Sequence, residues 1–231
     1  MTKFNTSTTN NPLRLAEISY ATSGAPSWFP FHAAMDALLQ IPTIPAPVFD
    51  HLPQRATAYD KRGKIPDKSL LLHGYIADRK LSTQLSNPES WIARFSGFAG
   101  VISPDFSICY DDPLDRRIFS VRMSRAIGAL YALHGITVIP NIRWGDSRDF
   151  SFAFEGVEIG SIVAVSNHGL WRTPKLRQGF LAGLPRMIER LHPTAVYVHG
   201  TMNHPLVREL ALSTCFVHLP SDATLARRGV R

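Results

Sequence analysis

Several apolar runs of the sequence end on polar side chains that can exchange protons or bind anions. Asp105 closes one run and suits a general base or, alternatively, a ligand for a divalent cation. His199 closes another run and suits an acid–base residue or a metal ligand. Asn141 and Arg143 are two residues apart, so they point to one side of a strand, where the planar guanidinium could bind phosphate or carboxylate. We predict Asp105 and His199 as catalytic residues and Asn141 and Arg143 as anion-binding residues.

Three further residues are predicted to bind the substrate or an anion. Trp144 could stack on a base or another ring, and Asn167 closes a third apolar run. Arg125 lies in a predicted helix over 113–134 and continues an apolar stripe. An arginine in such a stripe either extends its head to solvent, which we favour, or pairs with a buried carboxylate. The other members of the stripe are Leu114, Ile118 and Val121.

Each of these residues also has a structural interpretation. Asp105 could cap a turn, and Arg143 could pair with Asp146 or Asp149. A tryptophan or histidine at a strand end is more often a core residue than a ligand-binding one. The functional interpretation predicts that Asp105, Arg143 and Asn167 face the same cavity, because the carboxyl ends of parallel strands lie on one side of a sheet.

Six short apolar runs have the length of strands. They show no alternation of polar and apolar residues, which favours parallel strands buried on both faces. The runs cover residues 69–76, 100–106, 136–144, 161–167, 195–199 and 215–219.

The segments between these runs predict helices that begin with a capping residue followed by proline. The side chain of the cap accepts a backbone N–H, and proline loses nothing at the first helical position. Four such pairs follow strands: Asn87-Pro88, Asp112-Pro113, Thr173-Pro174 and His204-Pro205. This recurrence predicts an α/β fold with right-handed βα repeats and a mainly parallel sheet of about six strands. The sheet is expected to be either open and doubly wound or incomplete and barrel-like.

The residues before the first run predict a different organisation. Residues 1–23 are polar and predict a disordered tail. Residues 24–68 are rich in proline and predict an arm that packs on the core, with a short helix near 31–40 and a loop over 56–68. Residues 69–231 are expected to form a single α/β domain.

Composition limits the class of protein. Of 231 residues, 45% are hydrophobic, which excludes a largely disordered chain. No apolar stretch approaches the ~18 residues of a spanning helix, and the N-terminus lacks the apolar core of a secretory signal. Two cysteines argue against a disulfide framework and a four-ligand zinc site. With 25 Lys+Arg against 18 Asp+Glu, the net charge of +7 favours an anionic partner such as a nucleotide or nucleic acid. We therefore expect a cytoplasmic protein with no membrane partner.

Several enzyme classes are excluded by absent motifs. The sequence has no G-x-x-x-x-G-K-[ST] and no G-x-G-x-x-G after a strand, which argues against a P-loop or Rossmann nucleotide site. It has no H-E-x-x-H, no cysteine pair and no G-x-S-x-G, which argues against zincins, zinc deaminases and α/β-hydrolases.

Three strings in the middle of the chain resemble a known family. They are V-I-S-P-D-F-S at 101–107, R-A-I-G at 125–128 and G-I-T-V-I-P-N-I-R-W-G at 135–145. Over about residues 49–200 the sequence resembles the uncharacterised family known as domain of unknown function 4417. The resemblance implies a phage, plasmid or other bacterial mobile-element context and no established activity.

Two functions follow from these observations. The first is an enzyme with a strand-end polar site that acts on a phosphate-bearing substrate, either a nucleotide or a nucleic acid. The alternative is a non-catalytic protein that binds nucleic acid and assists replication or transfer of a mobile element. The first rests on the polar strand ends, and the second rests on the charge and the mobile-element context.

Overall fold

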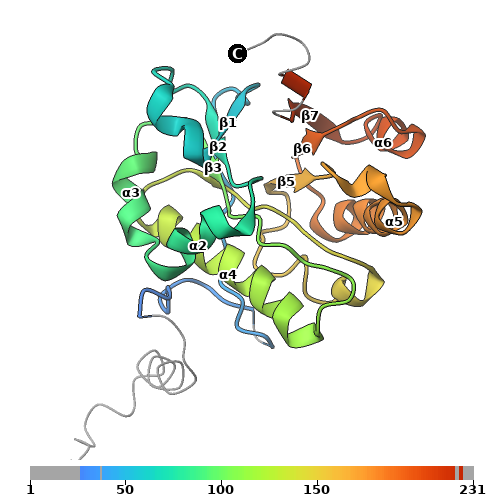
Figure 1. Cartoon of the computed structure of the whole chain (residues 1–231), viewed down its shortest axis with the longest axis horizontal. Helices are drawn as coiled ribbons and strands as arrows, with labels where there is room; N and C mark the ends of the chain where they lie inside the picture. The colour runs from blue at the N-terminus through green and yellow to red at the C-terminus, as the bar shows by residue number, and fades with distance from the viewer. Residues whose placement is uncertain (1–26, 37, 222–223, 226–231) are drawn as a thin grey trace, which may run out of the picture.

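The computed structural model describes residues 27–36, 38–221 and 224–225, and its strands form two parallel sheets (Figure 1). The first sheet has the order β1-β2-β3-β4 and the second has the order β5-β6-β7. The strands are β1 (Ala56–Ala58), β2 (Leu71–His73), β3 (Gly100–Ile102), β4 (Val138–Ile139), β5 (Ile162–Ser166), β6 (Ala195–Gly200) and β7 (Cys215–Pro220). The predicted disordered tail at 1–23 lies outside the described residues.

Helices connect the strands, and all neighbouring strands are parallel, which confirms the predicted α/β class. The α-helices are α2 (Asp78–Ser86), α3 (Glu89–Phe95), α4 (Leu114–Leu133), α5 (Pro174–Leu191) and α6 (Pro205–Leu210), and the 3-10 helices are η2 (Tyr59–Lys64), η3 (Ser147–Asp149) and η4 (Leu170–Arg172). Proline-preceding caps form at Thr173, whose Oγ1 accepts the Leu176 N–H, and at His204, whose Nδ1 accepts the Leu206 N–H.

The two sheets adjoin where β4 ends. An isolated parallel bridge joins Asn141 to Ala164 of β5, and the Ile142 N–H donates to the Ala164 carbonyl at 2.7 Å. Strands follow one another in chain order within both sheets, without the reversal that defines a doubly wound sheet. Among the described residues β1 and β7 do not pair, so the sheets do not close into a barrel.

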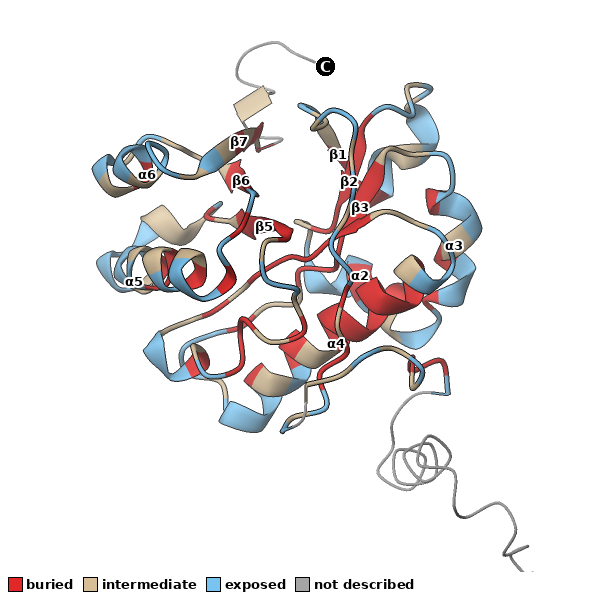
Figure 2. Ribbon diagram, turned by 180° about the vertical axis from the view of Figure 1, so that it is seen from behind, coloured by how far each residue is buried: buried red, intermediate tan, exposed pale blue. Residues whose placement is uncertain are grey.

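Side chains alternate between two faces of the sheets. On β6, Ala195 and Tyr197 belong to a core cluster shared by both sheets, whereas Val196 and Val198 pack toward α5. On β2, Leu71 joins the shared cluster and Leu72 packs toward α4. The helices thus cover the outer faces, and the inner faces of the two sheets pack on each other (Figure 2). Because side chains alternate along a strand, a polar residue at a strand end that lies two residues after an inward-facing one, such as His199 after Tyr197, also lies on this inner side.

Two expectations about local structure are wrong. Residues 56–58 form β1, and residues 59–64 form a 3-10 helix, in place of the expected loop. The described part of 31–40 forms turns and a bridge from Met35 to Pro42 instead of a helix. The described part of 31–40 forms no helix because the carboxylate of Asp36 accepts the N–H groups of Leu38, Leu39 and Ile41, which fixes a turn there.

The two ends of α4 extend beyond the first sheet. Phe119 and Leu133, near the two ends of this helix, are exposed. The 20-residue helix is about 30 Å long, whereas strands of two or three residues span about 10 Å, so only the middle of α4 lies over the sheet. No helix in the described part of the chain is long and apolar enough to cross a membrane.

Candidate functional site

Three of the predicted residues form one hydrogen-bonded cluster at the carboxyl ends of β3 and β4. The Asn141 amide donates to Asp105 Oδ1 at 2.8 Å, and Arg143 Nη1 donates to Asp105 Oδ2 at 2.8 Å. The two-residue spacing of Asn141 and Arg143 therefore brings both side chains to the same carboxylate. Asp105 is nearly buried, and Arg143 keeps a quarter of its side chain exposed.

Tyr75 extends this cluster toward the second sheet and was not predicted. Its hydroxyl donates to Asn141 Oδ1 at 3.1 Å. Its ring stacks on the imidazole of His199, with centroids 4.4 Å apart and planes 14° apart. Tyr75 follows Leu71 and His73 at two-residue intervals, so the strand period was the signal that could have identified it.

His199 lies at the end of β6, where other histidines and a serine surround it. Ser166 Oγ lies 3.0 Å from His199 Nδ1, and the rings of His73 and His168 lie 5.0 and 5.7 Å from its ring. Burial, followed by the nearby histidines His73, His168 and His218, lowers the pKa of His199 to about 2. The imidazole is therefore neutral at physiological pH.

Burial also governs the other titratable groups of the site. It raises the pKa of Asp105, while the Arg143 guanidinium and the Asn141 amide oppose this rise. Burial and the Asp105 charge raise the pKa of Tyr75 well above its ordinary value. Tyr75 thus stays protonated as a hydrogen-bond donor, and the ion pair at 2.8 Å favours the ionised form of Asp105.

Arg143 retains the capacity to bind another group. Its Nε has no hydrogen-bond partner in the described part of the protein, although it is buried. Two small pockets meet at this side chain, one lined by Asn141 and Arg125 and the other lined by Ser166 and Trp144. The alternative pairing of Arg143 with Asp146 or Asp149 is not observed.

Arg125 adopts neither of the two predicted arrangements. It is fully buried and reaches no carboxylate at ion-pair distance among the described residues. Its Nε, Nη1 and Nη2 donate to the carbonyls of Glu155, Asn141 and Ala153 at 3.0, 2.6 and 3.0 Å. Burial lowers the pKa of Arg125 to about 9. Arg125 therefore fixes three backbone segments, including the one that positions Asn141.

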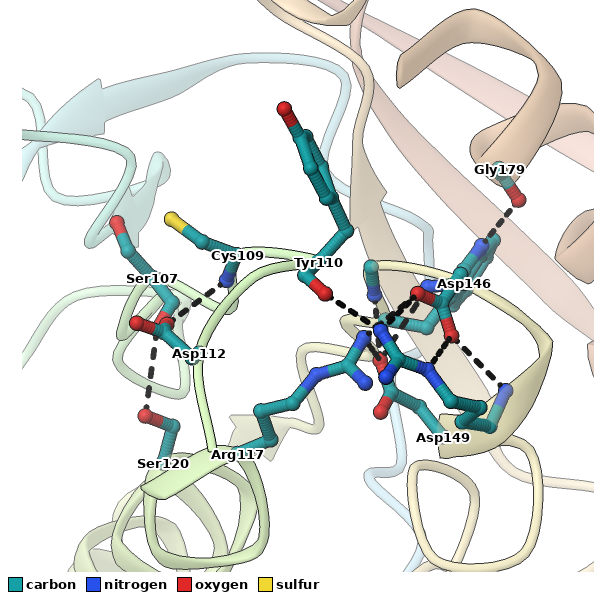
Figure 3. Close-up of polar contacts among 12 residues, drawn as sticks. Ser107, Cys109, Tyr110, Asp112, Arg117, Ser120, Asp146, Asp149 and Gly179 are labelled. Carbon is teal, nitrogen blue, oxygen red and sulfur yellow. Dashed lines mark hydrogen bonds and ion pairs between the residues drawn. The ribbon is translucent and has the colours of Figure 1, made fainter. Parts of the chain in front are cut away.

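A second buried arginine, which the sequence analysis did not single out, pairs with the acidic residues of η3. Arg117 Nη2 lies 2.9 Å from Asp149 Oδ2 and 3.3 Å from Asp146 Oδ2 (Figure 3). Both Arg117 and Asp149 are fully buried, and Asp149 also accepts the Gly145 N–H at 2.7 Å. These contacts hold the loop after Arg143 against the start of α4.

Trp144 and Asn167 are held by other partners than the Asp105 cluster, although Trp144 lines one of the pockets beside Arg143. Trp144 stacks on Phe180 of α5 at 5.7 Å and donates its indole N–H to the Gly179 carbonyl, so little of its ring is open to a ligand. Asn167 is buried, and its amide binds both the N–H and the carbonyl of Thr201. The prediction that Asn167 shares a cavity with Asp105 and Arg143 finds no support in the residues that line the pockets around Arg143.

The site does not resemble a metal centre. Within residues 27–36, 38–221 and 224–225, no group of three or more His, Cys, Asp or Glu residues is placed to hold a metal ion. Both oxygens of Asp105 accept hydrogen bonds, one of them from a cation, which opposes the binding of a second cation. The arrangement instead suits an anion beside Arg143, with polar groups that can position or exchange protons.

Comparison with known proteins gives a family and a phage context. The sequence model of a family described as Domain of unknown function (DUF4417) matches residues 33–217. The Gene 1 proteins of the Mycobacterium phages L5 and D29 are 32% and 33% identical over 144 and 145 residues. Each alignment includes 60% of this chain and 63% or 53% of the phage protein, so the chain spans less than two thirds of either relative. No solved structure matches the chain significantly.

Proposed function

The chain belongs to the family described as Domain of unknown function (DUF4417), and from this premise we propose that it is a phage-associated enzyme acting on a phosphate-bearing substrate. The substrate class is a nucleotide or nucleic acid, bound where β3, β4, β5 and β6 end. Ligands of open parallel sheets bind at this end, because the connecting loops can vary there without disturbing the core.

The observation that supports this proposal most directly is the state of Arg143. Its guanidinium is oriented by Asp105 through one nitrogen, while its Nε has no partner among the described residues and the side chain is partly exposed. A buried N–H without a partner is costly in a folded protein, so it favours a ligand with an acceptor oxygen. Two oxygens of a tetrahedral phosphate can accept hydrogen bonds from the planar fork of a guanidinium at the same time.

The neighbouring side chains can assist chemistry on a phosphate bound at Arg143. Asp105 holds the guanidinium, and Asn141 links Asp105 to Tyr75 through both ends of its amide. His199, neutral and stacked on Tyr75, has its Nδ1 at hydrogen-bond distance from a hydroxyl that lines a pocket beside Arg143. These groups provide an anion site, a fixed orientation and a proton acceptor within one connected cluster.

The experiment that tests this function measures phosphate binding and turnover. We expect the protein to bind AMP in calorimetry and to hydrolyse bis(p-nitrophenyl) phosphate slowly. Arg143→Gln should lower AMP affinity on the order of tenfold or more, because one charge-assisted contact contributes about 1.5–3 kcal/mol. Arg148→Gln is the matched control, since Arg148 is exposed and its partners are Asp146 and the Tyr110 carbonyl. Equal affinities for the wild type and Arg143→Gln would refute the proposal.

The nucleic-acid-binding alternative is favoured by a separate cluster of cations. The guanidinium groups of Arg62 and Arg94 lie 4.5 and 5.1 Å from the ring centre of Trp91. Neither arginine has an ion-pair partner in the described part of the chain. Burial and the charge of Arg94 lower the pKa of Arg62. Two arginines held on one indole favour an anionic partner such as a nucleic-acid backbone.

The salt dependence of DNA binding tests this alternative. For a short DNA duplex, the logarithm of the affinity should fall linearly with the logarithm of the salt concentration, by about 0.9 for each phosphate neutralised. Replacing both Arg62 and Arg94 with Gln should reduce this slope by about 2. The control is Arg186→Gln, which removes an exposed arginine of α5 that pairs with Glu189. An unchanged slope in the double variant would refute this second function.

A further inference from the structure

We propose that Ser166 is a nucleophile of this site and that its hydroxyl proton passes to His199. The proposal rests on the proposed function, because it places the phosphoryl group of the substrate beside Arg143. Ser166 is the last residue of β5, and it is the register partner of His199 on β6. The two side chains are therefore held as direct neighbours by the parallel pairing of two well-formed strands.

The hydrogen bonds of Ser166 determine where its proton points. The backbone N–H of His168 donates to Ser166 Oγ at 3.3 Å, which uses one acceptor position of the hydroxyl. The hydroxyl proton can then be donated to His199 Nδ1, 3.0 Å away. A serine hydrogen-bonded to a neutral imidazole has the arrangement of an activated nucleophile and its base.

The surroundings separate the accessible nucleophile from its buried base. Ser166 is half-buried and lines a small pocket together with Arg143, whereas His199 lies behind it and is almost fully buried. The stacked ring of Tyr75 fixes the plane of the His199 imidazole. In the tautomer that carries its hydrogen on Nε2, the neutral His199 can accept the serine proton at Nδ1, 3.0 Å from Ser166 Oγ. The burial that lowers the pKa of His199 opposes this transfer, so the imidazolium can form only with the negative charge of the phosphoryl group beside it.

The reaction that this arrangement permits is phosphoryl transfer to serine. Ser166 Oγ attacks the phosphorus, a new Oγ–P bond forms, and the bond from phosphorus to the leaving oxygen breaks. The serine proton moves to His199 Nδ1. The leaving oxygen departs from the opposite side of the phosphorus and takes a proton from water, and His199 then releases its proton to water and returns to its neutral form. Arg143 balances the negative charge of the phosphoryl oxygens during the step.

The test uses diisopropyl fluorophosphate, which forms an Oγ–P bond with reactive serines and releases fluoride. We expect one adduct in the full-length protein, mapped to Ser166 by peptide mass spectrometry and absent from Ser166→Ala. His199→Gln should label on the order of 100-fold more slowly, as expected when a general base is lost. Ser107→Ala is the matched control and should label at the wild-type rate, since Ser107 is another half-buried serine, in the loop after β3, whose hydroxyl donates to Asp78.

The results separate this inference from the proposed function. A wild-type protein without an adduct at Ser166 overturns the inference, whatever the fold of the variants. Equal labelling rates in the wild type and a folded His199→Gln variant overturn it as well. The reagent carries no negative charge, so labelling does not require the Arg143 phosphate site. Loss of AMP binding alone therefore refutes the proposed function, whereas loss of labelling alone refutes the role of Ser166.

Discussion

Two arginines from different elements line the same pocket as Asn141, and their hydrogen bonding differs. Arg125 of α4 is fully buried, and all three of its nitrogen positions donate to backbone carbonyls. Arg143, after β4, is partly exposed, and its Nε has no partner in the described part of the chain. A buried charge with every donor satisfied stabilises a fold, whereas an unsatisfied donor beside a pocket favours a ligand. Arg125 and Arg143 are therefore distinguished better by which of their N–H groups have acceptors than by how far each side chain is buried.

Arg117 limits this comparison, because its Nε is also buried without a hydrogen-bond partner among the described residues, although it lines neither of the two pockets that meet at Arg143. Like Arg125 it lies on α4 and is fully buried, but it pairs with the carboxylates of Asp149 and Asp146. Arg143 pairs with Asp105, yet both of these side chains keep some solvent contact. If burial sets the strength of each ion pair, removing the arginine should lower the free energy of unfolding more at Arg117 than at Arg143.

The largest effect on stability is expected for Arg117→Met. This change leaves Asp149 fully buried and without its principal cation, so the free energy of unfolding should fall by about 3–5 kcal/mol. Chemical denaturation measures this loss. Arg116→Met is the control on the same helix, because Arg116 is exposed and its pair with Asp112 should contribute less than about 1 kcal/mol. A loss at Arg117 as small as that at Arg116 would contradict the assignment of a buried ion pair.

A smaller loss, about 2–3 kcal/mol, is expected for Arg125→Met. Three buried carbonyls lose a charged donor, but no carboxylate is left behind and the cost of burying the guanidinium disappears. Methionine retains an apolar stem of similar length. A loss below 1 kcal/mol in denaturant unfolding would place Arg125 among ordinary surface residues and remove the contrast with Arg143.

The strand period was sufficient to predict part of the site. Asn141 and Arg143 meet Asp105 because parallel strands end on one side and residues two apart share a face. The same rule fails for Asn167, since it follows Ser166 by one residue and so points away from the inner face. Sequence spacing identifies a shared face only within one strand, and the partner of each strand is a property of the folded sheet.

Other features could not be predicted because they depend on tertiary contacts. The apolar stripe that contains Arg125 indicated that its stem is buried. Its hydrogen-bond partners could not be predicted, because every residue has a backbone carbonyl and the sequence does not show which ones face a side chain. Strand β1 is three residues long and is stabilised by pairing with β2 rather than by its own pattern. The fold class was predictable from six apolar runs and intervening helices. The division into two sheets was not predictable. Only one isolated bridge, between Asn141 and Ala164, joins the end of β4 to β5, and the extent of strand pairing is a property of the folded chain.

His199 is expected to have an intermediate effect on the free energy of unfolding, and only at acidic pH. Its folded-state pKa of about 2 lies below the value of about 6.5 expected for the unfolded chain, so the unfolded state binds a proton first as the pH falls. The free energy of unfolding therefore decreases as the pH falls below about 6.5, and at pH 5 the decrease caused by His199 amounts to about 2 kcal/mol. The groups that face it and share this environment are Tyr75, Ser166 and the histidines His73, His168 and His218.

Comparison of the wild type with His199→Gln isolates this contribution. The difference in unfolding free energy between the two proteins should change by about 2 kcal/mol in favour of the variant between pH 7 and pH 5. His134→Gln, at the exposed end of α4, is the control for removing an imidazole from the protein. Parallel pH profiles for the wild type and His199→Gln would contradict a neutral, buried imidazole at this position.

The smallest effect on stability is expected for Arg143→Gln, about 1 kcal/mol or less. Glutamine retains an amide that can donate to Asp105, Asn141 continues to donate to the same carboxylate, and solvent reaches the vacated space. A double-mutant cycle with Asp105→Asn measures the coupling directly, and it should give about 1 kcal/mol or less. The same cycle for Arg117 and Asp149, with Arg117→Met and Asp149→Asn, should give at least about 2 kcal/mol. Equal coupling in the two cycles would show that the Asp105–Arg143 pair contributes to the fold as the Arg117–Asp149 pair does. In that case the free Nε of Arg143 would no longer distinguish a ligand site from a structural one.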